Sequence, residues 1–466
     1  MVHLRLARGV TMNRRSLNWF SAAVSAVTLA GSVYGQGAAA ANSPGLAQSS
    51  APITLTLQDA LGRAQMNAPQ LLSAVNDANQ AREDVLQAQA AQRPNVSFRS
   101  EYLGTQGNGL LPSGRFVTND GVHVYRDWGV VHQDFTAALT KTGQQRAEAA
   151  EALALARAEI ARRGLAVTVT KAYYALLAGQ RKYATAQQAV DQAKNYLDIT
   201  QKLENGGEVP HSDTIRADFQ YSQQAQAFEE AKLAMDNARL DLAVLLFRDF
   251  NQNFTVVDDL TLASTLPAFA DVQAMAEREN PDLRAANAAL RAAALDVKIA
   301  RQAYLPTLTA DAVYGIEANA FALHSSVAAV KDLGPLPNLG YFVTISLNVP
   351  VWDWGARSSK VRQAQLRRDQ ATVELTAAQR TLIRNLQGYY QEAQTARDQM
   401  DRLRRSLDLA SENLRLNGLR YQAGEATILE LVDAQTLLTG ARNAYDDGLV
   451  RYRLALANLQ TVTGTF

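Results

Sequence analysis

Two carboxylates just beyond the clearest turn of the chain are the first residues whose spacing could carry chemistry. Glu430 and Asp433 follow the turn at Gly424, and at a spacing of i, i+3 they share one face of a helix. Glu430 also stands three residues after Thr427, which is the spacing of a capping box, and a carboxylate at Asp433 is favoured by the helix N-terminus. The pair therefore forms either a functional, negatively charged helix face or an ordinary helix N-terminus.

Other reactive residue types show no catalytic pattern. The five histidines are His3, His123, His132, His211 and His324. They include no pair at i, i+4, so a helical zinc site is unsupported, and the absence of cysteine excludes thiol nucleophiles, thiolate metal sites and disulfides. The loop 109–114 lacks the Lys-Ser/Thr of a phosphate-binding loop, and no Gly-x-Ser-x-Gly sequence occurs. We expect no enzyme, no cofactor and no metal site. With 46 basic against 45 acidic residues, we also expect no nucleic-acid partner.

The elements around the two carboxylates are long helices. No proline interrupts 356–419 or 428–462, and Gly424 between them supplies the left-handed backbone that ends a helix. A second such turn lies at 205–210, where Gly207 follows another glycine and Pro210 can begin the next helix. The sequence therefore predicts two antiparallel helical hairpins with tip turns at Gly207 and Gly424. The limb 143–205 alone has 63 residues, about 95 Å of helix. Its counterpart spaces its apolar residues by threes and fours from Ala371 to Leu414, so we expect hairpins to pack side by side.

Each hairpin belongs to one copy of a tandem repeat. Four pairs of residues keep an offset of 212: Pro69 with Pro281, Pro94 with Pro306, Tyr102 with Tyr314, and Gly143 with Gly355. The tip glycines Gly207 and Gly424 differ by 217, which indicates a small insertion in the long helix. We expect a first structural repeat at 53–268 and a second at 269–466, each with a helix, two strands and a helical hairpin.

Four segments alternate between apolar and polar residues with a period of two: 96–102, 131–137, 308–317 and 341–349. Between them we expect Gly-rich loops at 104–128 and 318–340. Segments of this kind are typical of transmembrane barrel strands, and the alternative is a soluble, half-buried sheet. About eight strands are needed to close a barrel, so membrane-embedded strands would require several chains to share one.

The N-terminus has the order of a secretory signal. Four arginines precede an apolar stretch, Leu17–Val33, which is followed by small residues through Ala41. We expect residues 1–41 to be a signal peptide, with Met12 as a possible start, and the alternative is a membrane anchor. The apolar run is short for a membrane span.

Taken with these features, several motifs give the chain a resemblance to the TolC-like outer-membrane efflux proteins over about 53–464. They are Thr56–Ala64, Asn280–Leu283, Val349–Arg357 and the two hairpin tips. The resemblance implies an α+β, mainly α fold. It implies a homotrimer whose twelve-stranded outer-membrane β-barrel takes four strands from each chain and continues as an α-helical coiled-coil barrel in the periplasm. It also implies a passive, gated exit duct for efflux or type I secretion, in contact with outer-membrane lipid, a periplasmic adaptor and an inner-membrane transporter.

The resemblance further implies roles for residues at the tips. Three copies of Glu430 and Asp433 would form two stacked carboxylate rings at a pore constriction. Tyr421 and Asp213 match two partners of a gate link between closed hairpins. A basic residue that the family's best-known member carries is Ala426 here, so part of that lock is missing. The alternative functions are a periplasmic adaptor, which would carry one hairpin, and a coiled-coil structural protein, which would not need the alternating segments.

Overall fold

The computed structural model describes residues 53–105, 122–249, 252–261, 265–318, 321–330 and 334–464. The predicted signal peptide at 1–41 and most of the predicted loop at 104–128 lie outside these residues. The described part of the chain forms one compact unit within 52–466.

The first half of the described chain begins with a short strand and ends with a helical hairpin. Its elements are β1 (Ile53–Leu55), α1 (Leu57–Asn67), α2 (Pro69–Ala90), β2 (Asn95–Thr105), β3 (Val122–Asp134), α3 (Phe135–Thr140), α4 (Thr142–Asn205) and α5 (His211–Leu246). Local signals set these boundaries. Thr56 and Asp59 form a capping box at α1, and Pro69 at the first position of α2 lacks the N–H that a helix start leaves unpaired.

The second half repeats this order with an added strand pair, β6 and β7, and without a counterpart of α3. Its elements are β4 (Phe254–Val256), α6 (Phe269–Glu279), α7 (Pro281–Gln302), β5 (Thr307–Ala318), β6 (His324–Val330), β7 (Gly334–Pro337), β8 (Leu339–Asn348), α8 (Ala356–Gln422) and α9 (Ile428–Thr463). The starts of α6, α7 and β5 each lie 212 residues after the starts of α1, α2 and β2. The short strands β1 and β4 pair in parallel beside α4, whose Tyr173 hydroxyl contacts the carbonyls of Leu55 and Val257.

β2, β3, β5 and β8 form one antiparallel sheet in that order, so β2 and β8 are its edges. One face carries paired charges: Arg126 on β3 forms ion pairs with Glu101 on β2 and Glu317 on β5. On the same face His132 lies 2.7 Å from Asp311. Gly315 allows β3 and β5 to approach, because an added Cβ would come within 2.0 Å of the Asp127 carbonyl oxygen.

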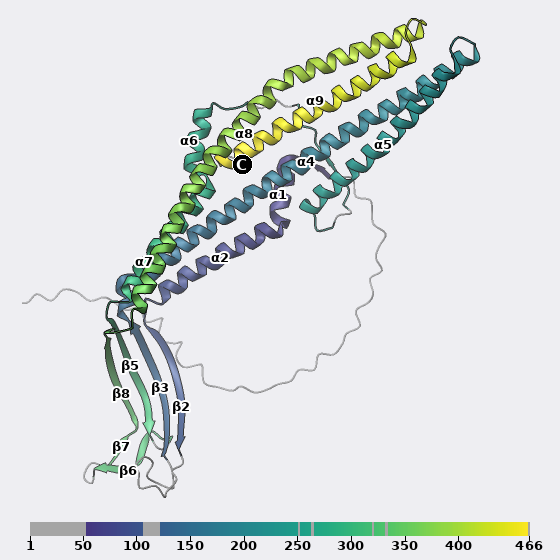
Figure 1. Ribbon diagram of the computed structural model, residues 1–466. Coiled ribbons are helices and arrows are strands. Elements are labelled where there is room, and N and C mark those ends of the chain that lie inside the picture. The colour runs from purple at the N-terminus through teal and green to yellow at the C-terminus, as the bar shows by residue number, and fades with distance from the viewer. Residues whose placement is uncertain are drawn as a thin grey trace, which may run out of the picture. The chain divides into compact units, whose positions relative to one another are not determined.

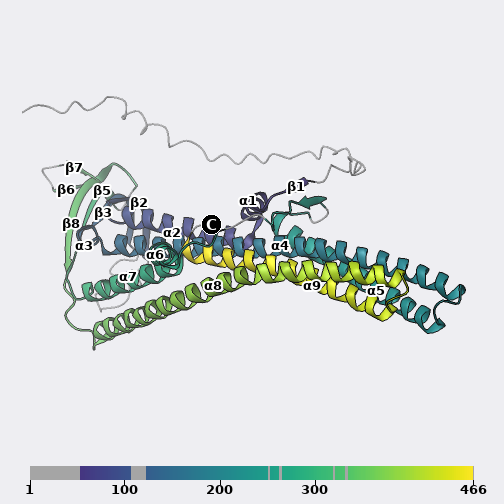
Figure 2. The same ribbon diagram turned by 90° about the horizontal axis from the view of Figure 1, so that it is seen from above.

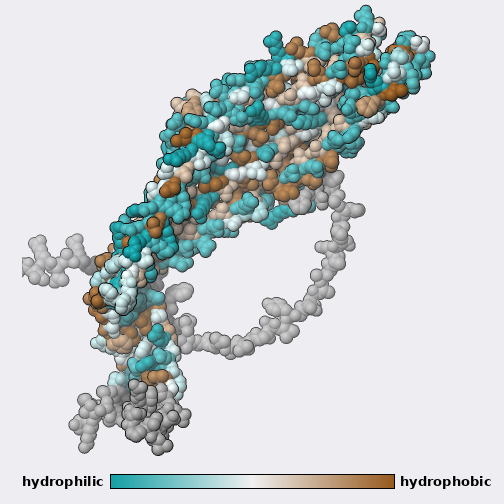
Figure 3. All heavy atoms as spheres, in the orientation of Figure 1, coloured by the Kyte–Doolittle hydropathy of each residue, from teal (hydrophilic) through white to brown (hydrophobic). Residues whose placement is uncertain are grey.

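The other face of the sheet is mainly apolar and largely exposed, with Asp127 and Gln133 of β3 as polar exceptions. One row across all four strands reads Val96, Val131, Ala312 and Val343, and the next row includes Phe98, Tyr314 and Tyr341. Val96 and Phe98 are each 73% exposed and Tyr341 is 81% exposed. A single chain therefore leaves a large apolar surface uncovered, which is uncommon in monomeric soluble proteins and marks an interaction surface. In Figure 3 apolar side chains are visible where the helices meet the sheet.

The helices pack side by side in a fixed order. α4 packs against α5 and against α9, and α9 packs against α8, so the order across the two hairpins is α5, α4, α9, α8. Nearer the sheet, α7 packs between α4 and α8, and α2 packs against α4. In both views the sheet and the hairpin tips lie at opposite ends of α4 and α8 (Figures 1 and 2). Within the described ranges, none of the helices combines the length and apolarity that crossing a membrane requires.

Three sequence predictions about the strands were wrong in detail. The strand predicted at 131–137 ends at Asp134, because the Asp134 carboxylate accepts hydrogen bonds from the N–H groups of Thr136 and Ala137 and starts α3. Of the predicted loop 104–128, Gly104 and Thr105 belong to β2 and 122–128 to β3. The predicted loop 318–340 contains the paired strands β6 and β7.

The two passages from strand to helix turn by different means. The first passes through α3 and the left-handed Lys141, with φ 51°. The second, which has Pro350 where the first has Ala138, passes through two consecutive left-handed residues, Trp354 and Gly355. Asp353 holds this second bend, since its carboxylate accepts hydrogen bonds from the N–H groups of Gly355 and Arg357 and pairs with the Arg357 side chain.

A buried arginine fixes the end of α9 against α4. Arg163 is only 3% exposed, and it donates one hydrogen bond to Glu159 at 2.6 Å and another to the Thr461 carbonyl in the last turn of α9. A cation at this place satisfies one of the carbonyls that a helix C-terminus leaves unpaired. The hydrogen bonds from Arg162, and then the one from Arg163, lower the pKa of Glu159 to about 2 against the opposing effect of partial burial.

We expect Glu159→Gln to lower the stability of the fold by about 2 kcal/mol at neutral pH, because it leaves a buried guanidinium without its anion. A lowered folded-state pKa stabilises the protein fully above the ordinary pKa of 4.5 and ceases to do so as pH falls toward about 2. The difference in melting temperature between the wild type and the variant should therefore shrink between pH 4.5 and pH 2. Glu412→Gln, in an exposed pair with Arg415, is the control and should have a much smaller effect. Equal effects of the two substitutions would contradict the role given to Arg163.

Candidate functional site: the hairpin tips

The first tip joins α4 to α5 by a turn built on Gly207. With φ at 75°, Gly207 has the left-handed backbone that favours glycine. The N–H of Glu208 donates to the carbonyl of Leu203, five residues earlier, and the N–H of Gly206 donates to that of Lys202. These bonds satisfy carbonyls at the end of α4, as in a Schellman turn. Across the turn the Nδ1 of His211 lies 2.7 Å from a carboxylate oxygen of Glu204.

The second tip joins α8 to α9 by the same kind of turn. Gly424 has φ at 74°, and the N–H of Glu425 donates to the carbonyl of Arg420, five residues earlier. Thr427 caps α9 by accepting from the N–H of Glu430. The structure therefore has left-handed turns at both predicted tip glycines, Gly207 and Gly424.

The two predicted constriction carboxylates have different surroundings. Glu430 completes the capping box with Thr427, and its carboxylate also lies 3.3 Å from the guanidinium of Arg420. Asp433 is exposed one turn further along α9, and among the described residues its carboxylate has no hydrogen-bond or ion-pair partner. Within one chain, then, the Glu430 carboxylate is engaged by Thr427 and Arg420, whereas the exposed Asp433 carboxylate is available for contacts outside the described chain.

The predicted gate-link residues Tyr421 and Asp213 are not paired with each other. Tyr421 is only 5% exposed, and its hydroxyl lies 2.8 Å from that of Thr200 on α4. The Thr200 hydroxyl also donates to the carbonyl of Tyr196. Asp213 lies in the first turn of α5, and no described residue contacts its carboxylate by a hydrogen bond. In this chain the hydroxyl contact joins α4 to α8, so it connects one hairpin to the other.

An apolar cluster surrounds this hydroxyl pair. Its fully buried members include Ile428 and Leu431 on α9, together with Ala217 on α5 and Ala410 on α8. The four helices of the two tips thus share one small core. The alanines let the helix backbones approach closely enough for the hydroxyls of Thr200 and Tyr421 to meet.

Two residues of the tips were not identified from the sequence. Thr200 lies within a long helix, and only its spacing from the tip turn could have suggested that it faces Tyr421. Arg420 bonds both the carbonyl of Glu425 and the carboxylate of Glu430, so it braces the turn from the α8 side. The sequence had pointed instead to the missing basic residue at Ala426.

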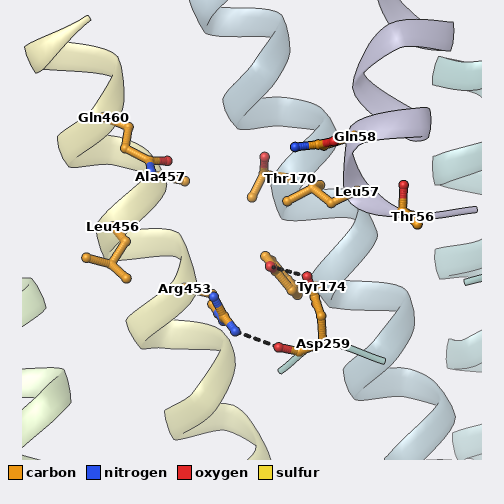
Figure 4. Close-up of a pocket in the computed structure, with 10 residues that line it drawn as sticks. All are labelled: Thr56, Leu57, Gln58, Thr170, Tyr174, Asp259, Arg453, Leu456, Ala457 and Gln460. Carbon is orange, nitrogen blue, oxygen red and sulfur yellow. Dashed lines mark hydrogen bonds between the residues drawn. The ribbon is translucent and has the colours of Figure 1, made fainter. Parts of the chain in front are cut away.

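A hollow away from the tips lies among α1, α4, α9 and the segment after β4. It has a volume of about 400 Å³ and is lined by Thr56, Leu57, Gln58, Thr170, Tyr174, Asp259, Arg453, Leu456, Ala457 and Gln460 (Figure 4). Arg453 donates to the carbonyl of Asp259 at 2.5 Å, and the Tyr174 hydroxyl donates to the Asp259 carboxylate. Burial, and then the charge of Asp259, raise the pKa of Tyr174 to about 12. A protonated tyrosine and a carbonyl-bound arginine hold the 257–260 segment in place, and this arrangement is structural. The described residues contain no cluster of three or more His, Asp or Glu side chains placed to hold a metal ion.

Comparisons with known proteins agree with this architecture. The family model described as "Outer membrane efflux protein" matches residues 273–465. The outer membrane protein TolC of Vibrio cholerae serotype O1 is 21% identical over 421 residues, which cover 90% of this chain and 92% of that protein. The pyoverdine export outer membrane protein OpmQ of Pseudomonas putida is 26% identical over 420 residues, covering 85% of this chain and 82% of that one. Among solved structures, the Campylobacter jejuni CmeC outer membrane channel has a TM-score of 0.76 at 18% identity, covering 88% of this chain and 85% of that one. The chain therefore has the fold of these outer-membrane channel proteins.

We expect Tyr421→Phe and Thr200→Val each to destabilise the joined tips by about 1 kcal/mol, because each removes one partner of a buried hydrogen bond. The double variant should cost less than the sum of the two, which a double-mutant cycle measures. Amide hydrogen exchange at 196–203 and 417–424 should accelerate in each variant. Tyr390→Phe, which removes an exposed hydroxyl bonded to the carbonyl of Pro267, is the control and should leave the tips unchanged. Strictly additive effects of the two substitutions would show that the hydroxyls do not interact.

Proposed function

Because this chain belongs to the TolC-like outer-membrane efflux proteins, we propose that it is the outer-membrane channel of a tripartite export system. In this proposal it is a passive, gated exit duct for efflux or type I secretion that spans the outer membrane and extends into the periplasm. A periplasmic adaptor and an inner-membrane transporter are its partners. The duct performs no catalysis and needs no cofactor.

The observation that carries this proposal is the open sheet. Its two faces differ in composition. One has an exposed apolar row through Val96 and Val343 and is interrupted by Asp127 and Gln133. The other has the ion pairs centred on Arg126, together with the apolar side chains of Val130, Val313 and Phe342. A transmembrane β-barrel needs this combination, with apolar side chains toward lipid and polar side chains toward a water-filled interior. The edges β2 and β8 would have to be paired, because a lipid phase leaves no water for their backbone groups.

Three copies supply the missing strands. Four strands are too few to close a barrel, whereas twelve strands from a homotrimer are enough to enclose a channel. The same three copies would place six helical hairpins in a ring below the barrel. The tandem repeats proposed at 53–268 and 269–466 fit this design, since each provides two strands of the sheet and one hairpin of the tube.

The hairpin tips are the proposed gate. Three copies of Glu430 and Asp433 form two stacked carboxylate rings that narrow the periplasmic entrance and attract cations. Asp433 contributes more to the charge of the pore than Glu430, because Arg420 and the capping box already occupy the Glu430 carboxylate. The hydroxyl pair of Thr200 and Tyr421 holds the two hairpins of one chain together. The predicted link through Asp213 then requires a partner outside its own chain.

A pair of adjacent residues on β8 tests the membrane assignment. Val343 lies on the apolar face and Thr344 on the polar face, opposite Asp311. Val343→Lys should cost about 2–4 kcal/mol if the residue lies near the middle of the bilayer, whereas Thr344→Lys should be tolerated. The readout is the amount of heat-modifiable oligomer in outer-membrane fractions. Equal recovery of both variants would refute the lipid-facing assignment.

Bilayer conductance tests the carboxylate rings. Asp433→Asn should weaken the block of single-channel current by multivalent cations more than Glu430→Gln does, since a glutamine retains the cap and Asp433 carries the freer charge. The matched control is Asp198→Asn, another exposed aspartate near the tips but on α4. If the control changes the block as much as Asp433→Asn does, the rings are not the cation site.

A further inference from the structure

The short segment between β8 and α8 exposes three large apolar side chains where the sheet meets the helices (Figure 1). Val351 is 87% exposed, Trp352 is 73% exposed and Trp354 is 89% exposed. Tryptophan normally buries most of its surface, so two exposed tryptophans in one turn mark an interaction surface. Their indole rings lie edge to face, with the ring centroids 5.7 Å apart. The segment therefore presents one joined aromatic surface.

The backbone of this segment is held in a conformation that costs free energy. Trp354 has φ 55°, in the left-handed region that bulky residues rarely adopt. The Asp353 carboxylate holds the turn, because it accepts hydrogen bonds from the N–H groups of Gly355 and Arg357. The Arg357 guanidinium in turn donates to the carbonyl of Pro350 and closes the turn. A strained turn that keeps two aromatic rings exposed supports a binding role for the segment.

This aromatic surface continues the apolar face of the sheet. Val343, Ile345 and Leu347 of β8 lie on that face and are 62–70% exposed. Val349 follows in the same alternation and is 52% exposed, and Val351 comes next. In the proposed channel this face meets lipid, so the two tryptophans stand where the lipid-facing part of the sheet ends. Tryptophan is enriched at this level of a bilayer, because its ring is apolar and its N–H needs a polar partner.

The chain beside this end of the sheet is strongly basic. The ten residues next to each of the four strand ends are 85–94, 135–144, 297–306 and 349–358. They contain five bases and one acid, a net charge of +4, and the acid, Asp353, is paired with Arg357. Asp134, the last residue of β3, is engaged in capping α3. The other four bases are exposed and have no ion-pair partner among the described residues. They form what we call the basic group: Arg93, Lys141, Lys298 and Arg301.

Anionic phospholipid is the partner whose chemistry fits both features. Its phosphate supplies the counter-charge that the basic group lacks, and the boundary between its headgroup and its acyl chains suits the two tryptophans. A zwitterionic lipid would accept the tryptophans but would leave the basic group without a net counter-charge. A soluble acidic partner would satisfy the basic group but would give the tryptophans no apolar surroundings.

We propose that this end of the sheet binds anionic phospholipid in the leaflet of the outer membrane that faces the periplasm. Trp352 and Trp354 lie at the level of the headgroups, and the basic group binds the lipid phosphates. This inference rests on the proposed channel, and it names the lipid that surrounds the rim of the barrel next to the helices. The strained turn at Trp354 keeps the aromatic surface formed before lipid arrives, so little ordering is needed on binding.

Quenching by brominated lipids tests the depth of the two tryptophans. Trp128→Phe leaves Trp352 and Trp354 as the tryptophans outside the predicted signal peptide, and Trp128→Tyr replaces it if the first variant gives no oligomer. The purified oligomer is reconstituted in phosphatidylcholine brominated either near the headgroup or near the end of the acyl chain. The bromines near the headgroup should quench about twofold more strongly than the deep ones.

The control for depth is W352F/W354F, which keeps Trp128 on the polar face of the sheet. Its fluorescence should be quenched only weakly by either lipid. If Trp352 and Trp354 are quenched no better than Trp128, they face the duct or a neighbouring copy, and the inference is wrong.

Lipid selectivity tests the basic group. Vesicles of phosphatidylcholine receive a small fraction of brominated lipid, either phosphatidylglycerol or phosphatidylcholine, and the Trp128→Phe protein reports which one gathers at the two tryptophans. Phosphatidylglycerol should quench severalfold more strongly at low salt, and this preference should fall as salt screens the charges. Equal quenching by the two lipids at low salt would refute the anionic site.

Two triple variants carry the matched comparison. K141Q/K298Q/R301Q should remove most of the preference for phosphatidylglycerol. K194Q/K232Q/R404Q makes the same change in net charge at exposed helical positions away from the sheet, and should keep the preference. Equal losses in the two variants would show that overall charge, and not the basic group, attracts the lipid.

The outcomes separate this inference from the channel proposal. If the wild type is a heat-modifiable oligomer in the outer membrane but its tryptophans are not quenched, the channel proposal stands and the lipid contact is wrong. If the wild type is recovered only as a single copy outside the membrane, the shared barrel itself is wrong.

Discussion

The backbone N–H and C=O groups on two strand edges need hydrogen-bond partners, and this need constrains how the rest of the molecule can be arranged. β2 and β8 end a four-stranded sheet whose apolar face has no cover within the described chain. In water such edges invite uncontrolled pairing, and in lipid they are forbidden. In the proposed assembly, pairing β8 of one copy with β2 of another would satisfy both edges at once. The sheet, which is incomplete by itself, would then be part of a closed barrel.

The helices follow a different physical rule. Among the buried positions near the tips, Ala217, Ala410 and Ala434 are small, so the helix backbones can come close at these points. Close approach makes short polar contacts possible across hairpins, such as the one between Thr200 and Tyr421. In the proposed tube, the tips of the hairpins could open locally without unfolding of the chain, because local opening costs only the contacts that it breaks, such as this hydroxyl pair.

The hydrophobic periodicity and the positions of proline and glycine made much of the fold predictable from the sequence. Proline at the first turn of α2 and α7, and glycine at both tips, fixed the helix ends to within a few residues. The strand pattern identified all four strands of the main sheet, and the error at Phe135 arose because a single aspartate, Asp134, started a helix where the alternation continued. The short strands β6 and β7 were missed because their sequence shows no clean alternation.

The candidate site was less predictable, for a physical reason. Tip glycines and a capping box are local, so the sequence revealed Gly207, Gly424 and Glu430. The partner of Tyr421 depends on how two hairpins more than 200 residues apart in sequence are aligned, and no local rule reports that alignment. Arg420 was missed for a similar reason, since its role depends on how the turn folds back onto α8.

In both the sheet and the helical layer, one free edge comes from each half of the chain. In the sheet, the free edges are β2 from the first half of the chain and β8 from the second. In the hairpins, the free edges are α5 from the first half and α8 from the second. In the proposed assembly, closing either layer would join the second half of one copy to the first half of the next, so a single rotation between copies would close both. A rotation that paired like edges would leave β2 facing β2. In the proposed assembly, the order of the helices is thus compatible with the same head-to-tail closure that backbone hydrogen bonding requires of the strands.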